Sequence, residues 1–215
     1  MNQALKTLKA YTVSVLAVAA IALSWPAQSP FAWAAPAKQD SNWKIDPVHS
    51  VASFSVRHLG ISNVRGEFTK VTGEGYYDGK TLSTAWVKTS IDISSISTRE
   101  TKRDDHLKSP DFFDAATYPT MTFASKRLRP MSRGKFQMVG DLTLHGVTRT
   151  VVLSCLGPTD AVKDPMGTMR FGASAQTTVN RKDYGLRWDK RLDNGGAIVG
   201  DEVSISLDVE FVRPK

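Results

Sequence analysis

The stretch Phe136-Gln-Met-Val-Gly-Asp-Leu-Thr-Leu-His-Gly-Val-Thr-Arg-Thr-Val-Val-Leu-Ser-Cys155 predicts a β-hairpin. Two runs of alternating apolar and polar residues flank the dipeptide His145-Gly146, which has the length of a tight hairpin loop. Folding the run about this dipeptide pairs Leu144 with Val147, and the pairing continues outward to the two ends of the stretch. One face of the hairpin is then apolar and the other mostly polar, which is typical of antiparallel strands with one wet side.

The rest of the chain from Trp43 onward continues as strand-length alternations joined by short turns. Gly73 and Gly75 fall inside one alternation and suggest a bulge or a strong bend. About eight long strands, each with one apolar face, remove their exposed edges best by closing into an antiparallel barrel. A barrel of that size encloses either packed side chains or one small ligand, so the pattern leaves open whether the interior is filled. The clearest alternations lie at 52–58, 85–93, 169–179 and 203–211.

One segment departs from the strand pattern. Ser97 and Glu100 have the spacing of a capping box, which predicts a short helix from about Thr98 to Leu107. The helix is polar nearly all round, so we expect it on the surface or over one end of the barrel. Phe112 and Phe113 follow it, and two adjacent phenylalanines in a loop need apolar surroundings, either the open end of the core or a ligand.

The N-terminal region has the features of a secretory signal peptide. Lys6 and Lys9 precede an apolar run at 10–25, and the small-residue site Ala32-Trp33-Ala34 follows. The alternative is an uncleaved membrane anchor, but the run is short against the ~20 residues that span a bilayer. Export predicts the periplasm, or secretion. The chain then divides into a signal peptide (1–34), a flexible N-terminal segment (35–42) and one domain (43–215).

The composition excludes several classes of protein. A formal net charge of +7 is spread along the chain, and its basic clusters are not interleaved with aromatic residues, so we expect no nucleic-acid binding. The same charge favours transient contact with an anionic membrane surface. Cys155 is the single cysteine, which permits neither an internal disulfide nor a cysteine-based metal site.

The sequence contains no motif that indicates a metal site or a catalytic site. His49 and His58 are nine residues apart, so on one regular strand they would face opposite sides, and His106 and His145 lie in the predicted helix and hairpin turn. There is no Gly-x-Ser-x-Gly elbow and no phosphate-binding glycine-rich loop. We therefore expect no metal site, no catalytic residue and no required cofactor, and the protein is not predicted to be an enzyme.

Arg149 is the exception on the apolar face of the hairpin. The pairing places it opposite Leu142 and three residues from the turn, so it is predicted to point inward near a barrel rim. Its guanidinium would then meet a charged or polar head group. The alternative is that the stem packs while the head reaches water.

Several motifs, taken together, resemble the YceI-like family of exported, lipocalin-like proteins that bind polyisoprenoid or other long apolar amphiphiles. The similarity runs from about Trp43 to Val212. It implies a lipocalin-like barrel with an elongated hydrophobic cavity that holds a long chain, in a periplasmic or secreted setting. It implies no fixed ligand and no universal catalytic residue. The motifs are Asp46–Ser50, Phe54–His58, Ser109–Asp114, Tyr118–Phe123, Leu142–Thr148 and Asn180–Leu186.

These observations predict a periplasmic carrier for an isoprenoid lipid, such as a polyprenyl or quinone-like molecule, with Arg149 as the head-group contact and Phe112 and Phe113 near a mouth. The alternatives are an enzyme acting on such a lipid, and a stress-response protein whose barrel is filled. The sequence does not decide whether the protein forms a homodimer. The residues predicted to line the cavity are Phe54, Val56, His58, Val87, Ile91, Phe112, Phe113, Phe123, Phe136, Met138, Leu142, Phe171 and Leu207.

Overall fold

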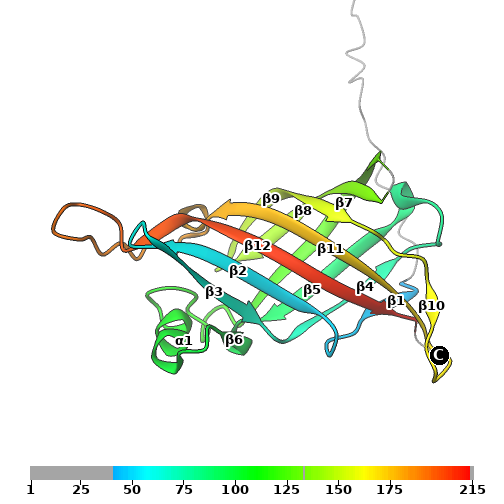
Figure 1. Ribbon diagram of the computed structural model, residues 1–215, viewed down its shortest axis with the longest axis horizontal. Coiled ribbons are helices and arrows are strands. Elements are labelled where there is room, and N and C mark those ends of the chain that lie inside the picture. Colours follow the sequence, from blue (N-terminus) through cyan, green and yellow to red (C-terminus); the bar gives the residue numbers. More distant parts are fainter. Residues whose placement is uncertain (1–40, 133, 214–215) are drawn as a thin grey trace, which may run out of the picture. The chain divides into compact units, whose positions relative to one another are not determined.

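The computed structural model describes residues 41–132 and 134–213 (Figure 1). The predicted signal peptide, and the predicted flexible segment up to residue 40, lie outside the described residues. Asn42, at the end of that segment, is bonded to the domain: its amide exchanges hydrogen bonds with the Tyr77 backbone, and its backbone N–H donates to the Gly75 carbonyl. No helix in the described part of the chain is long and apolar enough to cross a bilayer.

The described residues form a mostly antiparallel β structure with one α-helix. The strands are β1 (Trp43–Ile45), β2 (Val51–His58), β3 (Ser62–Phe68), β4 (Val71–Tyr76), β5 (Trp86–Asp92), β6 (Ile96–Ser97), β7 (Thr120–Ser132), β8 (Lys135–Leu144), β9 (Val147–Leu156), β10 (Val162–Lys163), β11 (Met169–Asn180) and β12 (Val199–Val212). The helices are α1 (Thr101–Lys108) and the short 3-10 turns η1 (Leu82–Thr84), η2 (Ile93–Ser95) and η3 (Arg181–Tyr184).

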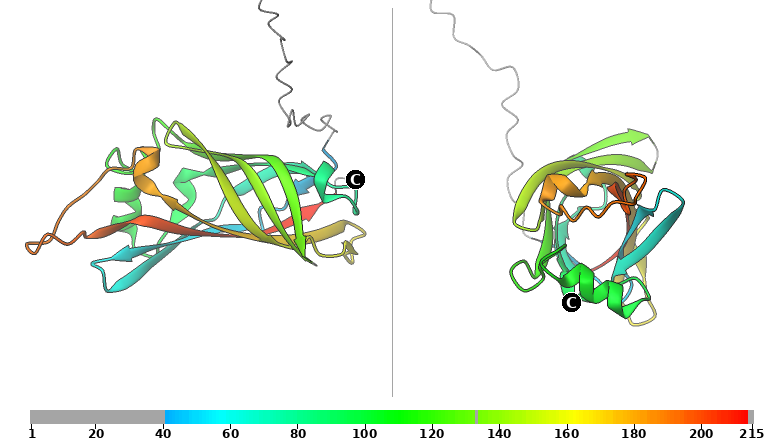
Figure 2. Two further views of the ribbon diagram at one scale, coloured as in Figure 1. Left: turned by 90° about the horizontal axis from the view of Figure 1, so that it is seen from above. Right: turned by 90° about the vertical axis from the view of Figure 1, so that its left-hand side faces the viewer.

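The sheet closes into the predicted eight-stranded antiparallel barrel. β1 and β2 share one position in the wall because both pair with β12, and β3 and β4 share the next position because they pair with β2 and β1. β5, β7, β8, β9 and β11 follow in order, and the long pairing of β11 with β12 closes the ring. The end-on view in Figure 2 shows this ring, with α1 lying against one end.

The β8–β9 hairpin has the register that the sequence predicts. Leu144 pairs with Val147, Phe136 pairs with Cys155, and every pair between them follows in step. His145 and Gly146 both have positive φ, at 51° and 72°, as a type I′ turn requires. The hairpin therefore forms as a local unit, with its apolar face on the interior of the barrel.

The prediction for Gly73 and Gly75 is wrong in one respect. β4 pairs with β5 without a register shift, so no bulge occurs between these strands. A Cβ atom at Gly73 would lie 2.3 Å from the Lys88 carbonyl oxygen, which means that the glycine permits close backbone approach. Register shifts occur instead in the pairing of β7 with β8 and of β12 with β2.

The predicted capping box is also wrong, although the helix is present. α1 begins at Thr101, and Glu100 is its N-cap, whose side chain accepts a hydrogen bond from the Arg103 backbone N–H. Thr98 lies outside the helix and is buried, where its hydroxyl donates to Asp104 and accepts from Arg103. The helix starts three residues later than predicted because these bonds engage Thr98 outside the helix.

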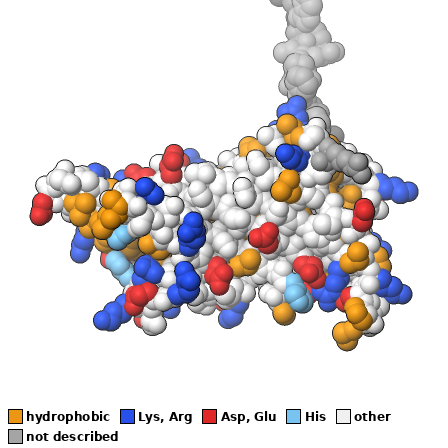
Figure 3. All heavy atoms as spheres, viewed as in Figure 1, with side chains coloured by type: hydrophobic (Ala, Val, Ile, Leu, Met, Phe, Trp, Pro, Cys, Tyr) orange, Lys and Arg blue, Asp and Glu red, His pale blue; other side chains and the backbone are white. Residues whose placement is uncertain are grey.

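An aromatic cluster packs at the end of the barrel away from α1. Phe171 stacks on Phe211 with ring centroids 4.8 Å apart, and the edge of Trp43 meets Phe171 at 4.6 Å. Between the two ends, the outer face of β2, β11 and β12 is largely free of hydrophobic and charged side chains (Figure 3). Ser53, Gln176 and Ser204, with neighbouring hydroxyl side chains, line a shallow groove there. The apolar faces of the strands thus turn inward.

Candidate ligand-binding cavity

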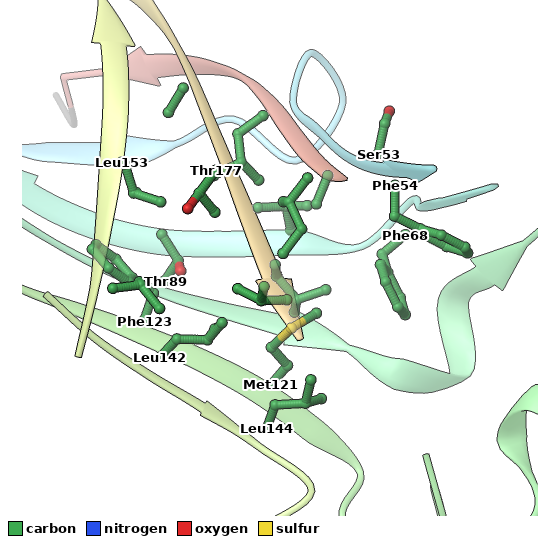
Figure 4. Close-up of a pocket in the computed structure, with 18 of the residues that line it drawn as sticks. Ser53, Phe54, Phe68, Thr89, Met121, Phe123, Leu142, Leu144, Leu153 and Thr177 are labelled. Atoms are coloured by element: carbon green, nitrogen blue, oxygen red, sulfur yellow. The ribbon is translucent and has the colours of Figure 1, made fainter. Parts of the chain in front are cut away.

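The barrel encloses a cavity of about 190 Å³. Its walls come from all the long strands, and its lining is almost entirely apolar. Phe123, Leu142 and Leu153 project into it from one side and Phe54 and Phe68 from another (Figure 4). Apolar cavities of about 150 Å³ in proteins stay dry and accept apolar ligands, so the interior is suited to hydrocarbon.

The structure brings nearly all the predicted lining residues around this one cavity. The small inward residues Ala52, Ala173 and Ala175 also lie on its wall, whereas the space beside Gly140 is taken by the Phe123 ring. The sequence therefore locates the cavity wall well, because the period-2 alternation of each strand fixes its inward face. The predicted residues that line the cavity are Phe54, Val56, Val87, Ile91, Phe112, Phe113, Phe123, Phe136, Met138, Leu142 and Leu207.

His58 and Phe171, which the sequence also predicts to line the cavity, are not on the wall of this cavity. His58 is the last residue of β2 and still pairs with Val199 of β12 and Ser62 of β3, but it lies beyond the point where the pairing with β12 shifts register. Phe171 points inward as predicted, but it belongs to the aromatic cluster and lines a smaller, separate chamber of about 60 Å³. Alternation gives the face of a residue but not its height along the barrel axis.

Phe112 and Phe113 lie where α1 meets the barrel. The Phe113 ring packs against Phe68 at 5.7 Å, and the Phe112 ring lies between His106 at 5.0 Å and Trp188 at 5.3 Å. Trp188 belongs to the segment 185–198, which we call the mouth loop, between η3 and β12. The two phenylalanines thus fill the space between the helix, the mouth loop and the cavity.

For Arg149 the structure agrees with the alternative that the sequence leaves open, in which the head of the side chain reaches water at the barrel rim. It pairs with Leu142 as expected, but its side chain is exposed and its Nε donates to the Asp183 carbonyl at 3.3 Å. β9 pairs with β11 only at Ser154–Leu156, so near the hairpin turn no neighbouring strand encloses the guanidinium. The structure gives Arg149 no contact with the cavity.

The cation on the cavity wall is Arg181, which the sequence analysis missed. Its side chain is only 4 % exposed. The alternation of β11, which places Ala175, Thr177 and Val179 on the cavity wall, continues to Arg181 and was the available signal. Arg181 lies within the motif Asn180–Leu186.

Five hydrogen bonds use all five N–H groups of Arg181. Nε donates to the Gly200 carbonyl at 2.9 Å, Nη1 to the Leu186 and Trp188 carbonyls at 2.7 and 2.8 Å, and Nη2 to the Val199 carbonyl and the Asp201 carboxylate. A guanidinium has no further donor to offer. Arg181 therefore holds both ends of the mouth loop and has no free N–H group for a ligand head group.

Cys155 lies on the cavity wall, and burial raises the pKa of its thiol to about 11. A thiol in this state is neutral at physiological pH and behaves as a small apolar side chain. This agrees with the inward position that the hairpin register gives it.

A second polar cluster lies at the aromatic end of the barrel. Asp46, His49 and Glu210 bring their potential ligand atoms within 4.8 Å of one another, which the sequence spacing did not indicate. Arg170 donates from Nη1 to Asp46 at 2.6 Å and to Glu210 at 2.5 Å, and from Nε to Asp164 at 2.7 Å. The hydrogen bonds from His49 and Arg170 hold the pKa of Asp46 well below its usual range. Arg170 is therefore already the cationic partner of the Asp46 and Glu210 carboxylates.

Comparison with known proteins decides the family. The YceI-like domain profile matches residues 43–211. The chain belongs to the YceI-like family. A UPF0312 protein of Vibrio cholerae is 36% identical to it over 141 residues, which cover 65% of this chain and 73% of the relative. A UPF0312 protein of Staphylococcus aureus is 34% identical over 174 residues, covering 80% and 97%.

Solved structures of this family share the fold. The Campylobacter jejuni YceI protein has a TM-score of 0.64 at 28% identity, covering 74% of this chain and 90% of that one. Burkholderia cenocepacia BcnA gives 0.64 at 24%, covering 77% and 98%. A polyisoprenoid binding domain from Saccharophagus degradans gives 0.59 at 15%, covering 81% and 100%. This YceI-like chain therefore has the barrel of its family, as the sequence motifs predicted.

Proposed function

We propose that this YceI-like protein is a carrier that sequesters a long-chain isoprenoid lipid, such as a polyprenyl or quinone-like molecule, inside its barrel. The observation that carries the proposal is the apolar cavity itself. Its lining extends from Ile45 and Phe211 to Leu186 of the mouth loop and Val199 at the start of β12, so it offers room for a chain more than for a compact ligand.

Binding in such a cavity is driven by burial of hydrocarbon, at about 25 cal/mol per Å² of apolar area removed from water. Arg181 is the charged residue on the cavity wall, and its N–H groups are all engaged. The ligand is therefore recognised through its chain, and a polar head group lies outside the cavity or contacts backbone near the mouth loop.

The comparisons support a binding role over a catalytic one. The Saccharophagus structure is described as a polyisoprenoid binding domain, and its barrel is similar to this one. We propose that the carrier acts in the periplasm, because the predicted signal peptide at 1–34 would direct the chain there. Transient contact with an anionic membrane would allow lipid to be taken up and released.

The test is lipid retention by two paired variants. Ala175 lies on the cavity wall at the middle of β11, and its neighbour Gln176 faces the outer groove. Ala175→Phe places a ring inside the barrel, and we expect it to abolish retention of a prenol added to the purified, delipidated protein. Gln176→Phe adds the same ring outside and should retain prenol as the unmodified protein does.

Native mass spectrometry after organic extraction and reloading measures this directly. The proposal is overturned if the unmodified protein retains no prenol, or if Ala175→Phe retains as much as Gln176→Phe. Circular dichroism of both variants establishes that the barrel is intact, so that a lost adduct reflects the cavity.

A further inference from the structure

The main cavity and the smaller chamber are neighbours that share a wall. The main cavity measures about 190 Å³ and the far chamber, on the side of the aromatic cluster, about 60 Å³. The residues that line both are Val87, Phe136, Met138, Ala173 and Phe211. These five side chains, which we call the constriction, therefore stand between the two spaces.

Phe136 is the central member of the constriction. It is only 4 % exposed, and its backbone is held on both sides, by Cys155 of β9 and Pro130 of β7. The backbone that carries the ring is therefore held in the sheet between two paired strands. Met138 comes next on the same face of β8, and Ala173, on β11, is the smallest side chain of the constriction. Flexible Met and small Ala side chains leave the two rings as the principal obstruction, and of these Phe211 is stacked on Phe171 in the aromatic cluster, so Phe136 is the ring to change.

The far chamber is itself suited to hydrocarbon. Its remaining walls include Leu82, Leu128 and Pro158, with Trp43 and Phe171 of the aromatic cluster at its end. Trp43 directs its ring N–H away, to the Tyr77 carbonyl at 3.0 Å, so the ring is satisfied and needs no ligand. The chamber is small and apolar, and it adjoins the main cavity at the constriction.

We propose that the far chamber is a subsite for the terminal part of an isoprenoid chain, and that Phe136 sets the longest chain the barrel holds well. This rests on the proposed function and adds to it a residue that determines specificity. A chain that passes the constriction and fills the far chamber is in full contact with apolar wall in both spaces. A longer chain must leave its extra methylenes in water, and each buried methylene is worth about fourfold in affinity.

Phe136→Leu opens the constriction while keeping an apolar side chain of similar reach. We expect the chain length of highest affinity to increase by at least one isoprene unit. Ala173→Leu narrows the same passage from the opposite strand, and we expect it to weaken the longest prenols that the unmodified protein binds while leaving the shorter ones unchanged. Opposite shifts from two positions would not arise from a general loss of packing.

Phe68→Leu is the matched control. Phe68 is also 4 % exposed and lines the main cavity, but it does not line the far chamber. The same loss of a ring there should weaken all chain lengths together, with no change in the preferred length. Thermal unfolding of the three variants identifies any that does not fold. The other two variants still test the proposed subsite.

The measurement is competition among a ladder of linear all-trans prenols that differ by single isoprene units, read by native mass spectrometry. Longer preferred chains for Phe136→Leu, with an unchanged preference for Phe68→Leu, would support the subsite. If the unmodified protein binds prenols but Phe136→Leu and Ala173→Leu keep its length profile, the inference is wrong and the carrier function stands. If the unmodified protein binds no prenol, the carrier function itself fails.

Discussion

At the scale of single residues, Arg181 determines how the mouth of the barrel is built. Its guanidinium joins carbonyls from both ends of the mouth loop, at Leu186 and Trp188 on one side and at Val199 and Gly200 on the other. Buried carbonyls need such a donor, because each one left unsatisfied costs about 1–3 kcal/mol. One side chain thus joins four backbone carbonyls at the two ends of this loop.

Arg181→Met should lower the free energy of unfolding by about 3 kcal/mol and loosen the mouth loop, because several acceptors lose their donor at once. Limited proteolysis within 185–198 should become faster, and bound prenol should dissociate sooner. The control is Arg187→Met, which removes an exposed arginine from the same loop. Equal protease resistance in the two variants would show that Arg181 does not hold the loop.

Arg149 and Arg181 show how far the alternation of one strand predicts the environment of a side chain. Arg149 belongs to the alternating face of its hairpin, yet it is exposed because η3, and not a strand, lies beside it. Arg181 follows from the alternation of β11 and does point inward. Alternation predicts the side of a strand, but whether that side is enclosed depends on neighbours that are distant in sequence.

At the scale of elements, the β8–β9 hairpin is the part that local sequence specifies most completely. Its turn needs two residues with positive φ, and its strands supply a continuous apolar face. Gly146 also lies against Tyr118, where a Cβ atom would be 2.7 Å from the ring, and Tyr118 packs on His145 at 4.6 Å. The turn is therefore fixed by its backbone and by one tertiary contact.

Gly146→Ala should destabilise the protein more than Gly134→Ala. Both glycines have positive φ, at 72° and 69°, so both substitutions incur the cost of about 1–2 kcal/mol for a left-handed residue. Only Gly146→Ala also disturbs the packing of Tyr118 on His145, since a Cβ at Gly134 meets nothing within 4 Å. Urea denaturation of the two variants compares them, and equal midpoints would rule out a role for the Tyr118 contact.

Local sequence specifies the helix α1 less completely than it specifies the hairpin. Ser97 and Glu100 satisfy the spacing of a capping box, but Thr98 makes its hydrogen bonds to Asp104 and Arg103 and is held outside the helix. The existence of the helix is a local property that the sequence predicts. Its first residue depends on which side chain reaches the exposed N–H groups, and sequence spacing alone cannot rank those competitors.

At the scale of the whole molecule, Arg170 joins three segments at the aromatic end of the barrel. It bonds Asp46 after β1, Asp164 before β11 and Glu210 in β12. Hydrogen bonds from Arg170 and from backbone N–H groups lower the pKa of Asp164, and His49 with Arg170 lowers that of Asp46. A carboxylate with a depressed pKa in the folded state stabilises the fold above its unfolded pKa, near 3.8.

This stabilisation is fully present at neutral pH and is lost as the pH falls from about 5 through the folded pKa values. We expect the stability of the unmodified protein to fall steeply below pH 4, and that of Asp164→Asn to fall less steeply from a lower starting value. Chemical denaturation across pH 2–7 tests this. Asp193→Asn, an exposed carboxylate of the mouth loop, should leave the slope unchanged. Equal slopes for both variants would contradict a role for the Arg170 cluster.

The barrel and most of its interior wall follow from the sequence because a closed sheet has a simple rule: alternate residues face in. The sequence does not predict where along the barrel axis each inward residue lies. Phe136 and Phe171 both face inward, but one divides the interior into two spaces and the other ends it. Strand stagger sets that height, and stagger depends on pairings such as that of β11 with β12, between segments joined by a long loop.

The position of β12 in the ring also governs the order of folding. It pairs with β11, β2 and β1, and its contacts with β1 join residues as far apart as Lys44 and Val212. Contacts this distant in sequence slow folding to the millisecond-to-second range typical of non-local β topologies. Because β12 completes the wall and is synthesised after β1 to β11, the interior space exists only once β12 has been made, and any occupant is acquired after that point.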